Sequence, residues 1–156
     1  MLQFGTSNNH LDCIPAEPFV DISVLDASHI PMLNMLQQLA REELQSRNLP
    51  WLPKDEPIDD LITYGYNFPV SVKHLHLHAV LSPYFHDAVF TAGRWHSHDK
   101  VIRDLKQFGR VRLYSDLFAA NDAEAIAESN AVVARAHALS RRLGPLKAAY
   151  DAAAKK

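Results

Sequence analysis

Three histidines alternate with leucines over residues 74–78, and no other part of this sequence is so well suited to chemistry. Successive side chains of a β-strand point to opposite faces, so a strand over residues 74–80 would place His74, His76 and His78 on one face. The apolar residues between them would then anchor the strand in a core. Each neutral imidazole carries a donor and an acceptor that must be satisfied, so such a row is costly unless it forms a site.

The spacing of the histidines is compatible with three roles. Imidazoles two residues apart on a strand can share a metal ion such as zinc, which would make a His-x-His-x-His metal site. An imidazole can also act as a nucleophile in nucleotide chemistry. The third role is structural, a stripe of hydrogen-bonded histidines on a half-exposed strand. The spacing by itself does not choose between these roles.

The composition limits the class of protein. The 156 residues are enough for one domain with a substantial core, and 47% hydrophobic with 22% charged residues is ordinary for a globular protein. The net charge of −2 gives no overall nucleic-acid signature. A single cysteine, Cys13, excludes an internal disulfide framework and a cysteine-rich zinc site. No stretch suits a membrane span or a signal peptide, so a cytoplasmic or nuclear location is expected.

The sequence around the histidines predicts the sheet and the helices that would position them. Strands are expected over residues 11–14, 61–66, 74–80 and 111–114. Helices are expected over residues 28–47, 98–108 and 121–143, the last of them alanine-rich and stopped by Gly144-Pro145. These elements predict an α+β fold, in which a small, mainly antiparallel sheet packs against a long helix and an alanine-rich C-terminal helix follows.

Residues 65–80 resemble the histidine triad superfamily. Its signature is His-φ-His-φ-His-φ-φ, where φ is apolar, and all seven positions match over residues 74–80. Ser71-Val72, just ahead of the first histidine, is similar to the Hint-type branch. Gly65-Tyr66 and the later Arg94-Trp95-His96-Ser97 are similar to the aprataxin-like and scavenger-decapping-like branches.

The resemblance extends more weakly over residues 10–108. Within it, His-Leu-Asp-Cys-Ile-Pro at residues 10–15 resembles the strand that precedes the family's first long helix. The implied organisation is a domain of this superfamily over residues 1–120, with a shortened N-terminus, and a C-terminal helical extension over residues 121–156.

The resemblance implies a nucleotide hydrolase or nucleotidyl transferase in which His76 is the nucleophile. Its imidazole would attack the α-phosphorus of a nucleoside phosphoramidate, an adenylate or a related phosphoanhydride, giving a covalent nucleotidyl-histidine that water hydrolyses. His74 and His78 would complete the catalytic set. The implied substrate and phosphate contacts are Ser71, Lys73, Asn67, Trp95 and His96. No metal or other cofactor is implied.

The implied partner is a purine nucleotide of AMP type, and a homodimer is also expected. Residues 94–112 hold six Lys/Arg against two Asp, which gives nucleic acid weak support as a further partner. No membrane partner is expected.

Two departures from the family pattern leave a second function open. The family is expected to carry a fourth histidine in a Pro-x-x-His arrangement, and after Pro15 that place is taken by Pro18. His96 or His98 could reach the same pocket instead. Members also have two or more strands ahead of the position of His10, close to which this sequence begins. A domain lacking these parts would bind nucleotides, or a partner, without efficient turnover.

Overall fold

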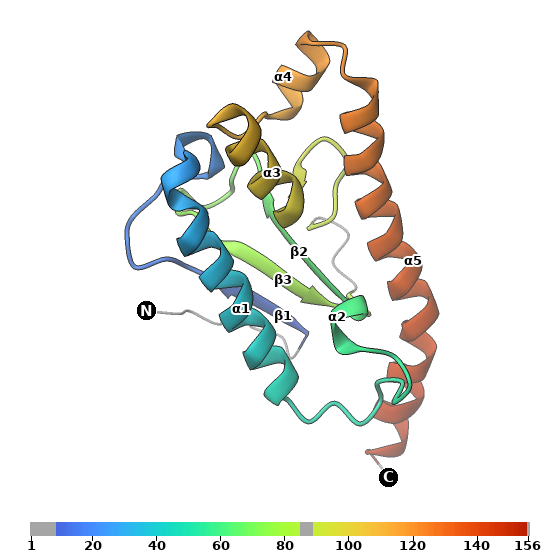
Figure 1. Ribbon diagram of the computed structural model, residues 1–156. Coiled ribbons are helices and arrows are strands. Elements are labelled where there is room, and N and C mark those ends of the chain that lie inside the picture. The colour runs from blue at the N-terminus through green and yellow to red at the C-terminus, as the bar shows by residue number, and fades with distance from the viewer. Residues whose placement is uncertain (1–8, 85–88, 156) are drawn as a thin grey trace.

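The computed structural model describes residues 9–84 and 89–155, and it confirms the predicted α+β class (Figure 1). Within these residues there is one antiparallel sheet, whose strands lie in the order β1-β3-β2-β4. The strands are β1 (His10–Cys13), β2 (Ile62–Asn67), β3 (Leu77–Leu81) and β4 (Trp95–Ser97). The histidine strand β3 is therefore an inner strand, with β1 on one side and β2 on the other.

Helices cover the sheet and lead into its strands. Two 3₁₀ turns, η1 (Ile22–Val24) and η2 (Ala27–His29), come before the first long helix. The α-helices are α1 (Ile30–Ser46), α2 (Ile58–Leu61), α3 (His98–Phe108), α4 (Tyr114–Ala119) and α5 (Ala123–Ala153). Within the described residues, none of these helices is both long and apolar enough to cross a membrane.

The main core lies between α1 and one face of the sheet, and Figure 1 shows α1 running across the strands. The helix buries an apolar stripe, and Leu33 and Leu44 are fully buried in it. Leu75, Leu77 and Ala79 alternate with the histidines and are also fully buried, as the sequence predicted. Burying each such leucine contributes about 2 kcal/mol to folding, so this face anchors the histidine segment firmly.

The opposite face of the sheet carries the histidine cluster and a smaller core. Val80 and Trp95 on this face pack with Val133 and Ala136 of α5. Figure 1 shows α5 running along the side of the molecule. The C-terminal helix therefore contacts the sheet directly and covers part of the face on which His78 lies.

The histidine strand is shorter than predicted, because β3 begins at Leu77 rather than at His74. β1 ends at Cys13, which pairs with Leu77, and Pro15 follows two residues later. Proline cannot donate to a ladder, so the residues before Leu77 have no strand to pair with on that side. The Leu75 N–H instead donates to the Phe19 carbonyl at 2.7 Å.

Two further predictions were wrong. Residues 111–114 form no strand, because two of their N–H groups are bound by carboxylates and Tyr114 begins α4: Arg112 N–H donates to Asp104 and Leu113 N–H to Asp116, each at 2.9 Å. Gly144-Pro145 does not end the last helix, since α5 continues to Ala153. Leu143 is fully buried in the main core, and this packing overrides the low helix propensity of glycine and proline.

Candidate functional site

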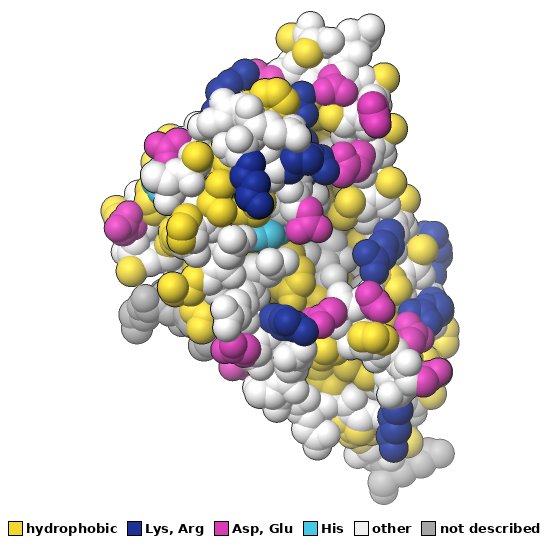
Figure 2. Space-filling model, viewed as in Figure 1, with side chains coloured by type: hydrophobic (Ala, Val, Ile, Leu, Met, Phe, Trp, Pro, Cys, Tyr) yellow, Lys and Arg dark blue, Asp and Glu magenta, His cyan; other side chains and the backbone are white. Residues whose placement is uncertain are grey.

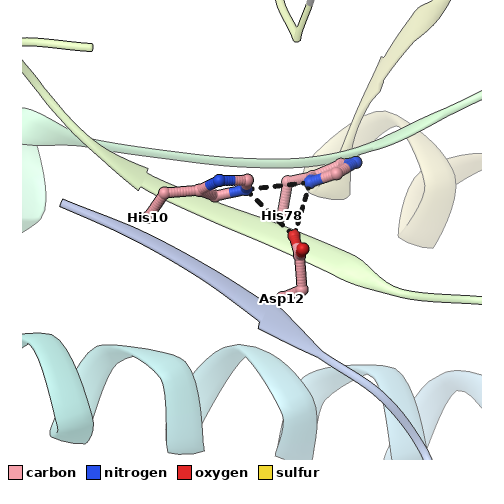
Figure 3. A group of neighbouring side chains, drawn as sticks. All are labelled: His10, Asp12 and His78. Carbon is pink, nitrogen blue, oxygen red and sulfur yellow. Dashed lines mark hydrogen bonds and ion pairs between the residues drawn. The ribbon is translucent and has the colours of Figure 1, made fainter. Parts of the chain in front are cut away.

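His78 lies at the centre of a cluster formed by two neighbouring strands (Figure 3). Its partner across the ladder is Asp12 on β1, and His10 lies two residues before Asp12 on the same face. His78 Nδ1 is 2.8 Å from Asp12 Oδ1 and 3.0 Å from His10 Nε2. The third edge of this triangle, between His10 Nε2 and Asp12 Oδ1, is 2.9 Å.

The charges of the cluster follow from its burial and its contacts. Burial of the Asp12 carboxyl raises its pKa, but the hydrogen bonds from His10 and His78 act in the opposite direction and hold the pKa well below its usual range. Burial lowers the pKa of His78, and the hydrogen bond to Asp12 offsets only part of this effect. At neutral pH the cluster therefore combines a carboxylate with a neutral His78 imidazole.

His76 precedes β3 by one residue and is held by the backbone. Its Nδ1–H donates to the His74 carbonyl oxygen at 2.7 Å. This bond fixes the tautomer and leaves the lone pair of Nε2 available for chemistry. The rings of His76 and His78 are in edge contact, with centroids 4.5 Å apart. His76 is half-buried, so its ring is not sealed in the core.

Asn67 and Trp95, two of the predicted substrate contacts, also lie against the cluster. Asn67 Nδ2 donates to His78 Nε2 at 3.2 Å. The Trp95 ring stacks on the His78 ring, with centroids 5.9 Å apart. This stacking requires Gly65, because a Cβ at that position would lie 2.5 Å from the Trp95 ring and 2.7 Å from the His96 carbonyl oxygen.

The other predicted contact residues are not brought into the cluster. Ser71 and Lys73 are exposed in the bend between β2 and β3. His74 contributes its carbonyl oxygen to His76, while its Nε2 is buried without a hydrogen-bond partner among the described residues. His96 points away from the cluster and contacts the Tyr114 ring, with centroids 5.1 Å apart. The fold therefore keeps the side chains of Ser71, Lys73 and His96 away from the cluster around His78.

Two cluster residues, His10 and Asp12, were missed as site residues by the sequence analysis. The signal was present, because they alternate with the buried Leu11 and Cys13 on a predicted strand, as the three histidines do with their leucines. Pro18, where the fourth histidine was expected, is exposed. The structure places His10 against His78 instead, so a further imidazole joins the triad residues without any contribution from Pro18.

His96 and His98 make the stability of the fold dependent on pH. Both are almost fully buried, and burial lowers the pKa of each to about 4, with Lys100 adding to the effect at His96. In an unfolded chain the pKa is near 6.5. The unfolded chain therefore binds protons that the folded chain does not, and the free energy of unfolding decreases as the pH falls from 6.5 towards 4.

We expect a loss of up to about 3 kcal/mol for each of these histidines between pH 7.5 and 4.5. Urea denaturation across this range measures it. Neither ring nitrogen of His96 has a hydrogen-bond partner among the described residues, so His96→Leu should leave the fold intact and remove about half of the slope that His96 and His98 together contribute. A stability curve that is level from pH 7.5 to 4.5 would contradict this account.

A cavity of about 600 Å³ lies elsewhere, beside the half of β2 that β4 does not cover. Its lining includes Arg41 of α1, Tyr64 of β2, His98 of α3 and Arg135 of α5. It has no lining residue in common with the histidine cluster. The candidate site is therefore identified by reactive side chains that lie close together, and not by the size of a cavity.

Four of the six Lys and Arg side chains in the basic segment at residues 94–112 form ion pairs. Lys100 and Arg112 contact Asp104, while Arg103 contacts Glu128 and Arg110 contacts Asp116. Figure 2 shows the same mixture on the face that it displays, where Lys and Arg side chains lie among Asp and Glu side chains. This pairing supports a structural role for the positive charge of the segment rather than an open nucleic-acid surface.

Comparison with known proteins agrees with the site. Residues 3–89, more than half of the chain, match the sequence family described as "Scavenger mRNA decapping enzyme C-term binding". The matched range includes β1, β2 and β3, and with them His10, Asp12 and the three alternating histidines. No curated protein matches the chain.

Proposed function

The chain belongs to the family of the scavenger mRNA decapping enzyme C-terminal domain, within the histidine triad superfamily, and on that premise we propose that His76 carries out nucleotidyl hydrolysis or transfer. Membership supports a nucleotide-binding or nucleotide-hydrolysing function of histidine triad type. The finer parts of the proposal are the covalent step through His76 and the substrate class, a nucleoside phosphoramidate, adenylate or related anhydride with an AMP-like part.

The observation that carries the proposal is the hydrogen bond from His76 Nδ1–H to the His74 carbonyl at 2.7 Å. A nucleophilic imidazole needs one nitrogen with a free lone pair and the other held as a donor. A backbone carbonyl is a suitable acceptor, because it cannot take the proton away. His76 therefore has the tautomer and the fixed ring orientation that attack through Nε2 requires.

The proposed reaction has two steps. His76 Nε2 forms a bond to the α-phosphorus, and the bond from phosphorus to the leaving nitrogen or oxygen breaks. The leaving group takes a proton from solvent; the family resemblance suggests Ser71 as a hydrogen-bond donor to it, although Ser71 is exposed here. A water molecule then attacks phosphorus and gives a proton to solvent, the bond to Nε2 breaks, and the nucleoside monophosphate is released with His76 restored. One difficult displacement is thus divided into two easier ones.

The groups around His76 support this chemistry. His78 is in ring contact with His76 and is held by Asp12 and Asn67, so its orientation is fixed before substrate binds. His10 adds a further imidazole to the cluster, next to His78. These features favour turnover over the alternative of a degenerate domain that only binds nucleotides.

The experiment that tests the proposal is turnover of adenosine 5′-phosphoramidate by the full chain, in the presence of a metal chelator. We expect release of AMP, and acid-quenched samples should contain protein carrying one covalent adenylyl group by intact-mass measurement. Nucleotide that raises the melting temperature without any AMP release or adduct would contradict the proposal, and it would favour the binding-only alternative.

A further inference from the structure

The three atoms at the centre of the cluster cannot all be satisfied by protons. His10 Nε2, Asp12 Oδ1 and His78 Nδ1 lie 2.8 to 3.0 Å from one another. An imidazole nitrogen either donates or accepts, but not both, and an ionised carboxylate only accepts. If both nitrogens carry protons, two N–H groups face each other. If one does not, its lone pair faces the carboxylate oxygen, so one edge of the triangle is always repulsive.

A bound cation would remove this conflict, because all three atoms would direct a lone pair at it. The bond from a transition ion such as Zn²⁺ to a histidine nitrogen or carboxylate oxygen is about 2.1 Å long. With bonds of about 2.1 Å, two neighbouring ligands lie about 3.4 Å apart at the tetrahedral angle and about 3 Å apart at a right angle. The three measured edges agree with the shorter spacing, as three ligands on one face of a six-coordinate ion would require.

The outer partners of the two imidazoles fit the same role. A histidine that binds a metal through one nitrogen is protonated at the other and donates from it to a fixed acceptor. His10 Nδ1 lies 3.2 Å from the Tyr84 hydroxyl, which can accept this bond. Asn67 lies 3.2 Å from His78 Nε2, and its Oδ1 is buried with no partner among the described residues. Rotation of the Asn67 amide by half a turn places its Oδ1 where it accepts a hydrogen bond from His78 Nε2–H.

We propose that His10, Asp12 and His78 form a binding site for one divalent transition-metal ion of the Zn²⁺ class. The donor set is two imidazole nitrogens and one carboxylate oxygen, which suits Zn²⁺ better than Ca²⁺ or Mg²⁺. Three protein ligands leave at least one coordination position open. The side chain of Asp12 is 34% exposed, so an ion can enter from solvent. The proposal does not depend on turnover through His76.

The site is tested by titrating the metal-free full chain with zinc chloride and measuring the heat of binding by calorimetry. We expect one Zn²⁺ per chain. Asp12→Asn and His10→Gln should abolish this binding while circular dichroism shows an intact fold. Tyr84→Phe removes only an outer partner and should weaken binding by about 10- to 100-fold. Binding of Co²⁺ should change the visible absorption spectrum of the ion in the wild type and leave the spectrum of the free ion unchanged in Asp12→Asn.

Two controls separate the outcomes. Asp26→Asn is the matched control, because Asp26 also lies 2.9 Å from a histidine nitrogen, of His29, but has no third ligand in the described metal-binding groups. It should bind zinc like the wild type. His76→Ala should also retain the zinc site, so loss of turnover and loss of metal binding are distinguishable. Absence of zinc binding, or binding that Asp12→Asn and His10→Gln leave unchanged, would overturn the proposal.

Discussion

Replacing His76 with alanine is expected to lower the kcat for adenosine 5′-phosphoramidate by at least about 10³-fold. The reason is geometric. Nε2 of this ring is the atom that would bond to phosphorus, and the His74 carbonyl holds only this ring in that tautomer. Single-turnover kinetics with a chelator present measure the loss. Intact-mass measurement of quenched samples should find the adenylyl adduct in the wild type and not in the variant.

His74→Ala is the matched control for this result. It removes an imidazole of the same row but keeps the backbone carbonyl that orients His76. We therefore expect a smaller loss of kcat and continued formation of the adduct. AMP is expected to raise the melting temperatures of His76→Ala and of the wild type equally, which would show that the binding pocket survives. Turnover by His76→Ala within tenfold of the wild type would exclude His76 as the nucleophile.

The helices that the sequence predicts best are those whose end signals are local. The predicted helix over residues 98–108 is α3 with the same bounds. The Ser97 hydroxyl accepts from the Lys100 N–H at its start, and Gly109 closes it with φ of 68°. By contrast, the continuation of α5 through Pro145 depends on core packing by residues distant in sequence, which local signals do not contain.

In the candidate site, too, the sequence predicts what depends on local patterns and not what depends on contacts between distant residues. The row of histidines could be read directly, because alternation on a strand is a local pattern. The partnership of His78 with Asp12 joins residues 66 positions apart, and it exists because β1 pairs with β3 in one particular register. A shift of that register by one residue would turn Asp12 into the core. The alternation over residues 10–13 indicates a polar strand face but not the strand that it pairs with, so the contact of His10 and Asp12 with His78 was found only in the structure.

Asp104→Ala is expected to lower the free energy of unfolding by about 3 to 5 kcal/mol. Asp104 is fully buried and Lys100 is 2% exposed. The carboxylate accepts from Lys100 Nζ at 2.7 Å and from the Arg112 N–H at 2.9 Å. Alanine would leave the Lys100 ammonium buried with the Arg112 carbonyl as its remaining described partner, at 2.6 Å. Urea denaturation at pH 7.5 measures the loss.

An exposed ion pair is the control that tests whether burial causes the loss of stability in Asp104→Ala. Glu128→Ala breaks the exposed Arg103–Glu128 pair and should cost less than about 1 kcal/mol. The double variant Lys100→Met, Asp104→Leu removes both charges together, so it should recover much of the stability that Asp104→Ala loses. A cost for Asp104→Ala no larger than that for Glu128→Ala would refute the argument.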